Sequence, residues 1–254
     1  MTAFGALRDG IRRVNEAPLV LAGMILVTLL VALPLSIALH GMLATHLGHS
    51  AAAEAAAQGA NYDWWEEFTA QASGLGTTFT PTIIGFAAVL ENTSRLLDNQ
   101  PMAATIAGAT VAWLVIWSFL SGGVVDRYAR RRPTRASGFF AACGTHFWRF
   151  LRLGVVAWFV YLWLFGPVHA LLFDVGYAGL TRDLTVERAA FLIRIAGYVL
   201  FLAILACFTL LFDFARIRIV VEDRRSALGA LAAGARFVVR HRRRVCALFL
   251  LNAA

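Results

Sequence analysis

The sequence contains an uninterrupted apolar run, from Pro18 to Met42, without a single Asp, Glu, Lys or Arg. An α-helix rises about 1.5 Å per residue, so about 20 apolar residues cross a hydrocarbon layer about 30 Å thick. Arg8, Arg12 and Arg13 precede the run as in a signal peptide, whose apolar region is however only about 7 to 15 residues long. The run therefore predicts an uncleaved signal anchor, with a cleavage-like alanine site at 51–53 as the alternative.

Three further segments have the length and composition of membrane-spanning helices. They run from Met102 to Gly122, from Leu153 to Leu172 and from Ala189 to Phe212. A fifth apolar segment, from Val245 to Ala254, is too short to span, so it is either re-entrant or, as we favour, the start of a fifth span that continues beyond the given sequence. With 59% hydrophobic and 15% charged residues, the predicted fold is an all-α, multi-pass transmembrane helical bundle over residues 1–254.

Arginine is distributed very unevenly along the chain. All 23 basic residues are arginine, which a GC-rich genome explains more simply than an arginine-specific function. Nineteen of them lie in the N-terminal segment and in the loops 123–152 and 213–244. Because basic residues in short loops are retained in the cytoplasm, this asymmetry predicts a cytoplasmic N-terminus in a bacterial inner membrane.

The loop 43–101 is then exoplasmic, and it is too long to be a simple connector. It holds six acidic residues and one arginine. Trp64 and Trp65 suit the headgroup region of the bilayer, and the stretch from Pro81 to Leu97 has helical spacing typical of an interfacial or re-entrant helix. We expect this loop to contact a protein partner.

Both basic loops are predicted to form cytoplasmic amphipathic elbows in the inner-leaflet interface. In each, apolar side chains recur at helical spacing, with Leu228, Leu231, Ala235 and Val238 on one face of the second elbow. The apolar faces should enter lipid and the arginines should meet anionic headgroups. The candidate interface residues are Phe139, Phe140, Phe147, Trp148, Arg149, Arg236, Arg240 and Arg244.

The two elbows align with a shift of ninety residues, which matches Gly144 with Gly234 and Phe147 with Phe237. Either a unit of helix, elbow and helix is duplicated in parallel orientation, or two unrelated segments are each adapted to the same membrane interface. The stretch FARIRIVVEDRRSALGALAAGARFVVRH, from Phe214 to His241, resembles the elbow of poorly characterised bacterial membrane proteins related to the membrane domain attached to some glycerophosphodiester phosphodiesterases. The resemblance implies six spans in a complete chain and carries no catalytic residues.

Two polar side chains fall inside predicted spans and are candidates for function, His40 and Arg194. Arg194 is shallow enough to snorkel outward or to pair with Asp174 or Glu187. His46 and His49 share a helical face, but their spacing matches no strong zinc signature, so an interfacial polar cluster is favoured over a metal site.

The sequence contains no GxSxG, Walker, HExxH or CxxC motif. We therefore expect no enzymatic activity, no cofactor, no metal and no nucleic-acid partner. The favoured hypothesis is a non-enzymatic scaffold or accessory subunit that binds anionic inner-leaflet lipid. The alternative is a permease-like subunit of a transporter, because ALGALAAGARF faintly resembles the coupling helix of importer permeases, although the EAA triplet is missing.

Overall fold

The computed structural model describes residues 2–59, 61–79, 94–100, 104–131 and 135–253. Within these ranges the chain is helical and has no strand. Four helices are long and apolar enough to cross a membrane: Pro18–Leu47, Ala107–Arg130, Ala136–Thr181 and Glu187–Val221. The all-α class and the four apolar stretches of spanning length are therefore confirmed.

The chain divides into two compact units, which are described separately. Unit one comprises Met1–Leu21 and Val115–Ala254. It holds α1 (Ala3–Asn15), the end of α6 (Ala104–Arg130), α7 (Ala136–Trp163), the π-helical η2 (Leu164–Val168) and η3 (Leu171–Tyr177), α8 (Ala178–Thr181), α9 (Glu187–Val221), α10 (Ala227–Arg240) and α11 (Arg242–Ala253). Unit two, Ala22–Leu114, holds most of α2 (Pro18–Leu47), α3 (Ala53–Ala57), α4 (Tyr62–Gln71), the 3-10 helix η1 (Gly74–Thr78) and the start of α6.

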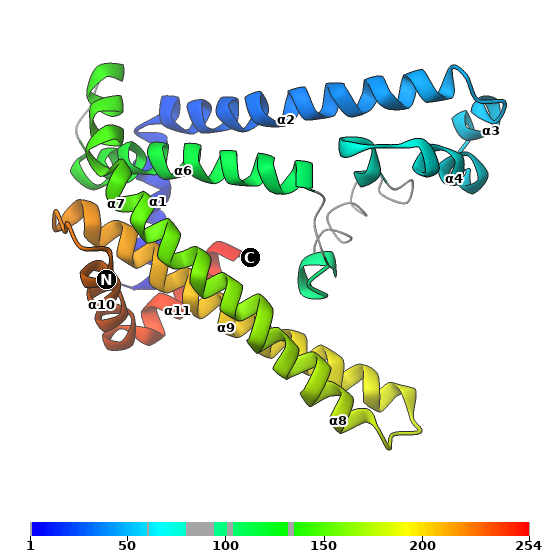
Figure 1. The fold of residues 1–254 in the computed structure, drawn as a ribbon. Coiled ribbons are helices and arrows are strands. Elements are labelled where there is room, and N and C mark those ends of the chain that lie inside the picture. Colours follow the sequence, from blue (N-terminus) through cyan, green and yellow to red (C-terminus); the bar gives the residue numbers. More distant parts are fainter. Residues whose placement is uncertain (1, 60, 80–93, 101–103, 132–134, 254) are drawn as a thin grey trace. The chain divides into compact units, whose positions relative to one another are not determined.

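The centre of unit one is the pair of long helices formed by α7 and α9, which run side by side in opposite directions (Figure 1). Buried residues recur along α7 at alternating intervals of three and four residues. Their side chains therefore form one narrow stripe on the face of α7 that packs against neighbouring helices. They are Cys143, His146, Phe150, Leu153 and Ala157 on α7, Leu164 at the start of η2, and Phe201, Phe212, Ala215, Ile219 and Val220 on α9. Large apolar side chains such as Trp158 and Phe159 lie outside this stripe and are exposed, as expected of helices surrounded by lipid.

A short helix, α10, folds back onto the end of α9. The turn between them places Asp223 at a positive φ of 49°, a conformation that Asp tolerates better than most residues. The Arg224 amide bonds to the Ile219 carbonyl at 3.1 Å, which closes the last turn of α9. Ser226 then caps α10 by accepting a hydrogen bond from the Gly229 amide at 3.2 Å.

The end of α6 crosses α7 at two consecutive glycines. A Cβ atom added at Gly122 would stand 2.9 Å from the Cβ of His146, and one added at Gly123 would stand 2.5 Å from the sulfur of Cys143. Only glycine leaves room for this approach. The crossing brings the buried polar side chain of Asp126 in α6 close to that of His146 in α7.

The predicted elbows have different boundaries in the structure. Residues 123–130 continue α6, and residues 136–152 form the first part of a continuous helical segment that reaches Thr181. No proline occurs in this segment before Pro167 in the π-helical η2. At about 1.5 Å per residue, these 46 residues extend well beyond a hydrocarbon layer about 30 Å thick. In the second region, 213–221 belong to α9 and only α10 is a separate short helix.

The aligned glycines of the two elbows have different surroundings. Gly144 has nothing within 4 Å of an added Cβ atom, whereas Gly234 packs against the backbone of α9. The duplicated unit and the two separate segments therefore both stay predictions. Of the predicted helix from Pro81 to Leu97, residues 94–97 are helical and residues 81–93 lie outside the described residues.

Candidate functional site

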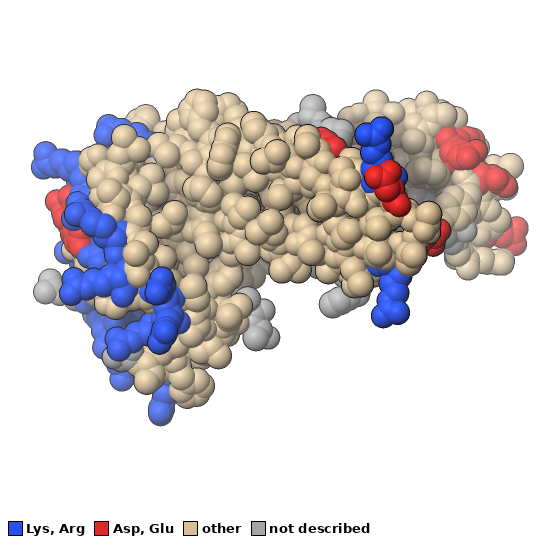
Figure 2. Space-filling view, turned by 90° about the horizontal axis from the view of Figure 1, so that it is seen from below, with Lys and Arg blue, Asp and Glu red and all other residues tan. Residues whose placement is uncertain are grey.

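Most arginines of unit one gather at one end, which we call the arginine end: α1, the last turns of α6, the start of α7, the end of α9, α10 and the start of α11. Figure 2 shows many of them together, in blue, on one face. In the sequence of these segments, nineteen arginines accompany six acidic residues. Such an excess of positive charge attracts anions.

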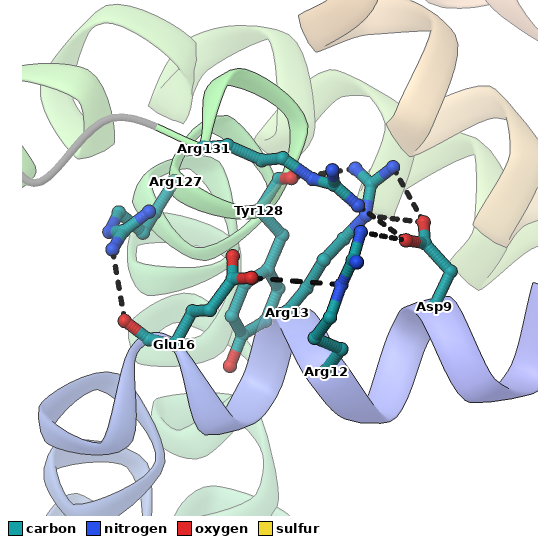
Figure 3. Close-up of polar contacts among 7 residues, drawn as sticks. All are labelled: Asp9, Arg12, Arg13, Glu16, Arg127, Tyr128 and Arg131. Atoms are coloured by element: carbon teal, nitrogen blue, oxygen red, sulfur yellow. Dashed lines mark hydrogen bonds and ion pairs between the residues drawn. The ribbon is translucent and has the colours of Figure 1, made fainter.

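The N-terminal helix α1 is held at the arginine end by one carboxylate (Figure 3). Asp9 accepts hydrogen bonds from Arg12 at 3.0 Å and from Arg13 at 2.9 Å, and it forms an ion pair with Arg131 of the segment after α6. The Arg13 guanidinium also donates to the Tyr128 carbonyl oxygen at 2.8 Å. The hydrogen bond from Arg13 is the largest cause that lowers the pKa of Asp9 below its ordinary value.

Two other contacts fix α1 in place. Arg127 of α6 donates to the Glu16 carbonyl oxygen at 3.2 Å, just beyond the end of α1. On its other side α1 packs against α11. Separate exposed ion pairs contribute only about 0 to 1 kcal/mol each, so the position of α1 depends on the network as a whole.

A buried polar group lies where α6 crosses α7. The Asp126 side chain, 13% exposed, accepts a hydrogen bond from Arg130 Nε at 2.6 Å. On its inner side, Nε2 of the buried His146 lies 4.0 Å from the same carboxylate oxygen, and His146 Nδ1 has no hydrogen-bond partner in the described structure. Asp126 therefore fixes the orientation of Arg130 from the protein interior.

Sequence reasoning did not select Asp9, Asp126 or Asp223, and the available signal was modest. Asp9 with Arg13, and Asp126 with Arg130, stand four residues apart, the spacing of helical ion pairs. Such pairs are common on solvated helices, so spacing alone does not reveal that Asp126 is buried. The partnership of Asp223 with Arg149 joins distant segments and has no signal of this kind.

Arg149, predicted to meet lipid headgroups, is instead engaged within the protein. Its side chain is largely buried and forms an ion pair with Asp223 in the turn after α9. The hydrogen bond from Arg149 is the largest cause that lowers the pKa of Asp223 below its ordinary value. This interface prediction is therefore corrected, because the turn supplies the carboxylate that the arginine binds.

The aromatic candidates of α7 separate into two groups. Phe139 lies against Gly123, and the Phe147 ring is 5.8 Å from the Phe119 ring, so both pack partly against α6. Phe140 and Trp148 are exposed. The Phe140 ring also stacks on the Phe119 ring at a centroid distance of 6.5 Å, so Trp148 is the most exposed of the four, and contact of these rings with lipid stays a prediction.

The arginines at the junction of α10 and α11 have no carboxylate partner within the described part of the chain. Arg236 bonds only to the Ala232 carbonyl oxygen of its own helix, at 3.3 Å. The other members of this group, which we call the junction arginines, are Arg240, Arg242, Arg243 and Arg244, all exposed. On α10 itself, Leu228 in the first turn and Val239 in the last turn are 68% and 71% exposed.

The packed face of α10 differs from the face predicted to enter lipid. Ala230, Ala233 and Gly234 are buried against α9, and Leu231 packs partly against the same core. Leu228 alone of the four predicted apolar residues is highly exposed. The small residues face the protein because they permit a close approach to the α9 backbone.

In unit two, the predicted headgroup residue Trp64 is buried, with 5% exposure. Its ring stacks on Phe68, and its indole nitrogen donates to Nδ1 of His46 in α2 at 3.1 Å. Phe79 contacts both aromatic rings. The prediction for Trp64 is corrected, whereas Trp65 is partly exposed and donates to the Phe79 carbonyl oxygen at 3.3 Å.

The remaining polar candidates show no catalytic arrangement. His40 is exposed on α2, and Arg194 Nε bonds to the Tyr198 hydroxyl at 2.8 Å with its guanidinium over the rings of Tyr198 and Tyr177. Among the described residues there is no cluster of three or more metal-ligating side chains.

Comparisons with family models, with curated proteins and with solved structures find no match for this chain. The resemblance of Phe214 to His241 to elbows of phosphodiesterase-associated membrane domains therefore stays a prediction. The residues themselves must carry any functional argument.

Proposed function

We propose that the chain is an integral protein of a bacterial cytoplasmic membrane, with its N-terminus in the cytoplasm, and that it serves as a non-enzymatic scaffold or accessory subunit. Its arginine end binds the acidic headgroups of the inner leaflet. The junction arginines carry this proposal, because they project from unit one without a carboxylate partner in the described structure.

The surroundings of the junction arginines support a bilayer surface as their ligand. Exposed Leu228 and Val239 lie on the same short helix as Arg236 and Arg240. A helix that combines exposed apolar side chains with arginines binds the boundary between headgroups and acyl chains, where both parts are satisfied. Each arginine near an acidic surface contributes about 1 kcal/mol of attraction, and salt screens it.

Lipid enrichment tests this proposal. The full chain is extracted with its surrounding lipid into polymer nanodiscs, and the anionic fraction of that lipid is measured. We expect enrichment of acidic phospholipid that falls with added salt and falls sharply in the triple variant Arg236→Gln, Arg240→Gln, Arg243→Gln. The matched control Arg182→Gln, Arg188→Gln removes arginines beyond the other end of the α7 and α9 pair. Equal loss in both variants, or no enrichment at all, overturns the proposal.

The scaffold role requires a partner, for which the exoplasmic loop is the candidate surface. Trp64, Phe68 and His46 form its buried centre, while Tyr62 and Glu66 lie exposed on the same short helix α4. A photo-reactive residue at Tyr62 should crosslink a reproducible protein in intact cells, and the same group at exposed Leu19 serves as the control. Crosslinking to nothing, or identical products from both sites, would contradict the role.

A permease-like subunit is the second candidate, favoured by one feature. α10 is a discrete short helix between α9 and α11, with Leu228, Arg236 and Val239 exposed for docking. Nucleotide-dependent substrate uptake in vesicles that is abolished by Leu228→Glu would favour this function over the scaffold.

A further inference from the structure

Within the arginine end, unit one contains a groove between the ends of α6 and α9 that the junction arginines do not line. The groove has a volume of about 780 Å³, and ligand pockets commonly measure about 300 to 1,000 Å³. A neighbouring hollow beside α1 has a volume of about 910 Å³. The groove is lined by Val125, Tyr128, Ala129, Ile217, Val220 and Val221, together with Arg13, Arg130 and Asp223.

The lining is apolar along α9 and α6, and part of it is exposed. Val221 is 60% exposed and Ile217 is 42% exposed. These side chains belong to the last two turns of α9, where Arg216 and Arg218 also occur. An apolar surface that begins among arginines suits a ligand with an acyl chain and an acidic head.

The three charged residues of the groove are not equivalent. Arg13 uses its guanidinium on Asp9 and on the Tyr128 carbonyl oxygen, and Asp223 is paired with Arg149. Arg130 bonds to Asp126 through Nε alone, and its terminal nitrogens bond to no acceptor in the described structure. Arg130 is therefore the group that can donate two parallel hydrogen bonds to a phosphate.

Arg130 is also oriented before any ligand arrives. Asp126 is largely buried, it bonds to Arg130 at 2.6 Å, and its other side faces the buried His146. Such support from the interior reduces the loss of side-chain entropy when Arg130 binds. A surface arginine without this support would bind phosphate less selectively.

We propose that this groove is a discrete site for one anionic phospholipid, whose phosphate binds the terminal nitrogens of Arg130 and whose acyl chain lies along Val125, Ile217 and Val221. A free phosphate would leave the apolar lining in water, and a lipid of no net charge would lack the charge complementarity of the arginine end. The site deepens the proposed function and rests on it, but it differs in being stoichiometric and resistant to salt.

Native mass spectrometry of the full chain in detergent tests the site, with dioleoylphosphatidylglycerol, dioleoylphosphatidylcholine and inorganic phosphate as probes. We expect one phosphatidylglycerol adduct that survives high salt, no phosphatidylcholine adduct of equal strength and none of phosphate. Losing a bidentate, charge-assisted contact should weaken the adduct about 10- to 100-fold in Arg130→Gln. Val221→Trp, which fills the groove from an exposed position, should block the acyl chain.

The variant Arg236→Gln, Arg240→Gln is the matched control and should leave the adduct unchanged. Thermal unfolding of each variant without lipid shows that it folds, and Arg130→Lys provides a second folded variant that keeps the charge but loses the bidentate geometry. Equal binding of phosphatidylcholine, competition by inorganic phosphate, or equal weakening in the control overturns the site. If the adduct is absent while salt-sensitive enrichment in nanodiscs persists, this inference fails and the proposed function stands.

Discussion

Gly234 of α10 lies directly against Ala215 of α9: a Cβ atom added at Gly234 would stand 3.1 Å from the Ala215 backbone nitrogen and 3.3 Å from the Leu211 carbonyl oxygen. Backbone atoms cannot move aside as a flexible side chain can. The position of α10, and with it the position of the junction arginines, therefore depends on the absence of a side chain at residue 234.

Gly234→Leu should separate α10 from α9 and lower the free energy of unfolding by about 1 to 3 kcal/mol, the usual cost of overpacking. Gly144→Leu is the matched control, because nothing lies within 4 Å of an added Cβ atom there and the residue is also within a helix. Denaturation of the detergent-solubilised protein, followed by circular dichroism, measures both. Equal destabilisation by the two substitutions would contradict the close packing.

The three cysteines should differ in reactivity. Cys143 is fully buried where α7 crosses α6, whereas Cys207 and Cys246 are exposed. A small maleimide should add readily to Cys246 of the folded protein in detergent, and to Cys143 and the detergent-covered Cys207 of the spanning helix α9 only after denaturation, as counted by intact mass. The variant Cys207→Ala, Cys246→Ala should remain unlabelled until it unfolds. Rapid labelling of Cys143 in that variant would show that the helix crossing is open.

The attachment of α1 should be sensitive to acid. Because ion pairs lower the pKa of Asp9, its contribution to stability is present above the unfolded pKa of about 3.9 and is lost as the pH falls through the folded pKa. A carbon-13 NMR titration of labelled aspartate, assigned with Asp9→Asn, should give a pKa below about 3.9.

Arg13→Gln should raise the pKa of Asp9 toward its ordinary value, because the largest cause of the lowering is removed. Arg8→Gln on the same helix should change it little, since Arg8 forms no ion pair within the described residues. A pKa of Asp9 that is unchanged by Arg13→Gln would show that the network of Figure 3 does not form in solution.

The aromatic centre formed by Trp64, Phe68 and Phe79 should determine whether the loop 43–101 is ordered. Trp64→Ala removes a buried ring and the hydrogen bond to His46, and burial losses of this kind cost about 3 to 5 kcal/mol. Tyr62→Ala, two residues away on an exposed face, is the control. Limited proteolysis should cleave α4 much faster in the first variant than in the second, and similar rates would refute the buried role of Trp64.

Patterns of many residues made the fold class predictable. The run from Pro18 to Met42 and its three counterparts contain too few charges for water, and helices of spanning length are present at all four places. Helix ends were less predictable, because Arg149 and Arg152 are polar but do not stop a helix. α7 therefore continues where the sequence predicted a separate elbow.

The candidate site was predictable in composition but not in pairing. The sequence identified the arginine-rich segments, and the junction arginines are exposed, while their binding of lipid stays a prediction. It did not identify Arg149 as an ion-pair residue or Trp64 as a buried one, because their partners, Asp223 and His46, come from elements distant in the chain.

The sequence alone determined that this chain forms long apolar helices and where its arginines are concentrated, because both follow from composition along consecutive residues. Only the tertiary structure decided which charges are already neutralised, which glycines hold helices together and which groove is left beside Arg130. Those properties depend on distances between residues far apart in sequence, and no local pattern encodes such distances.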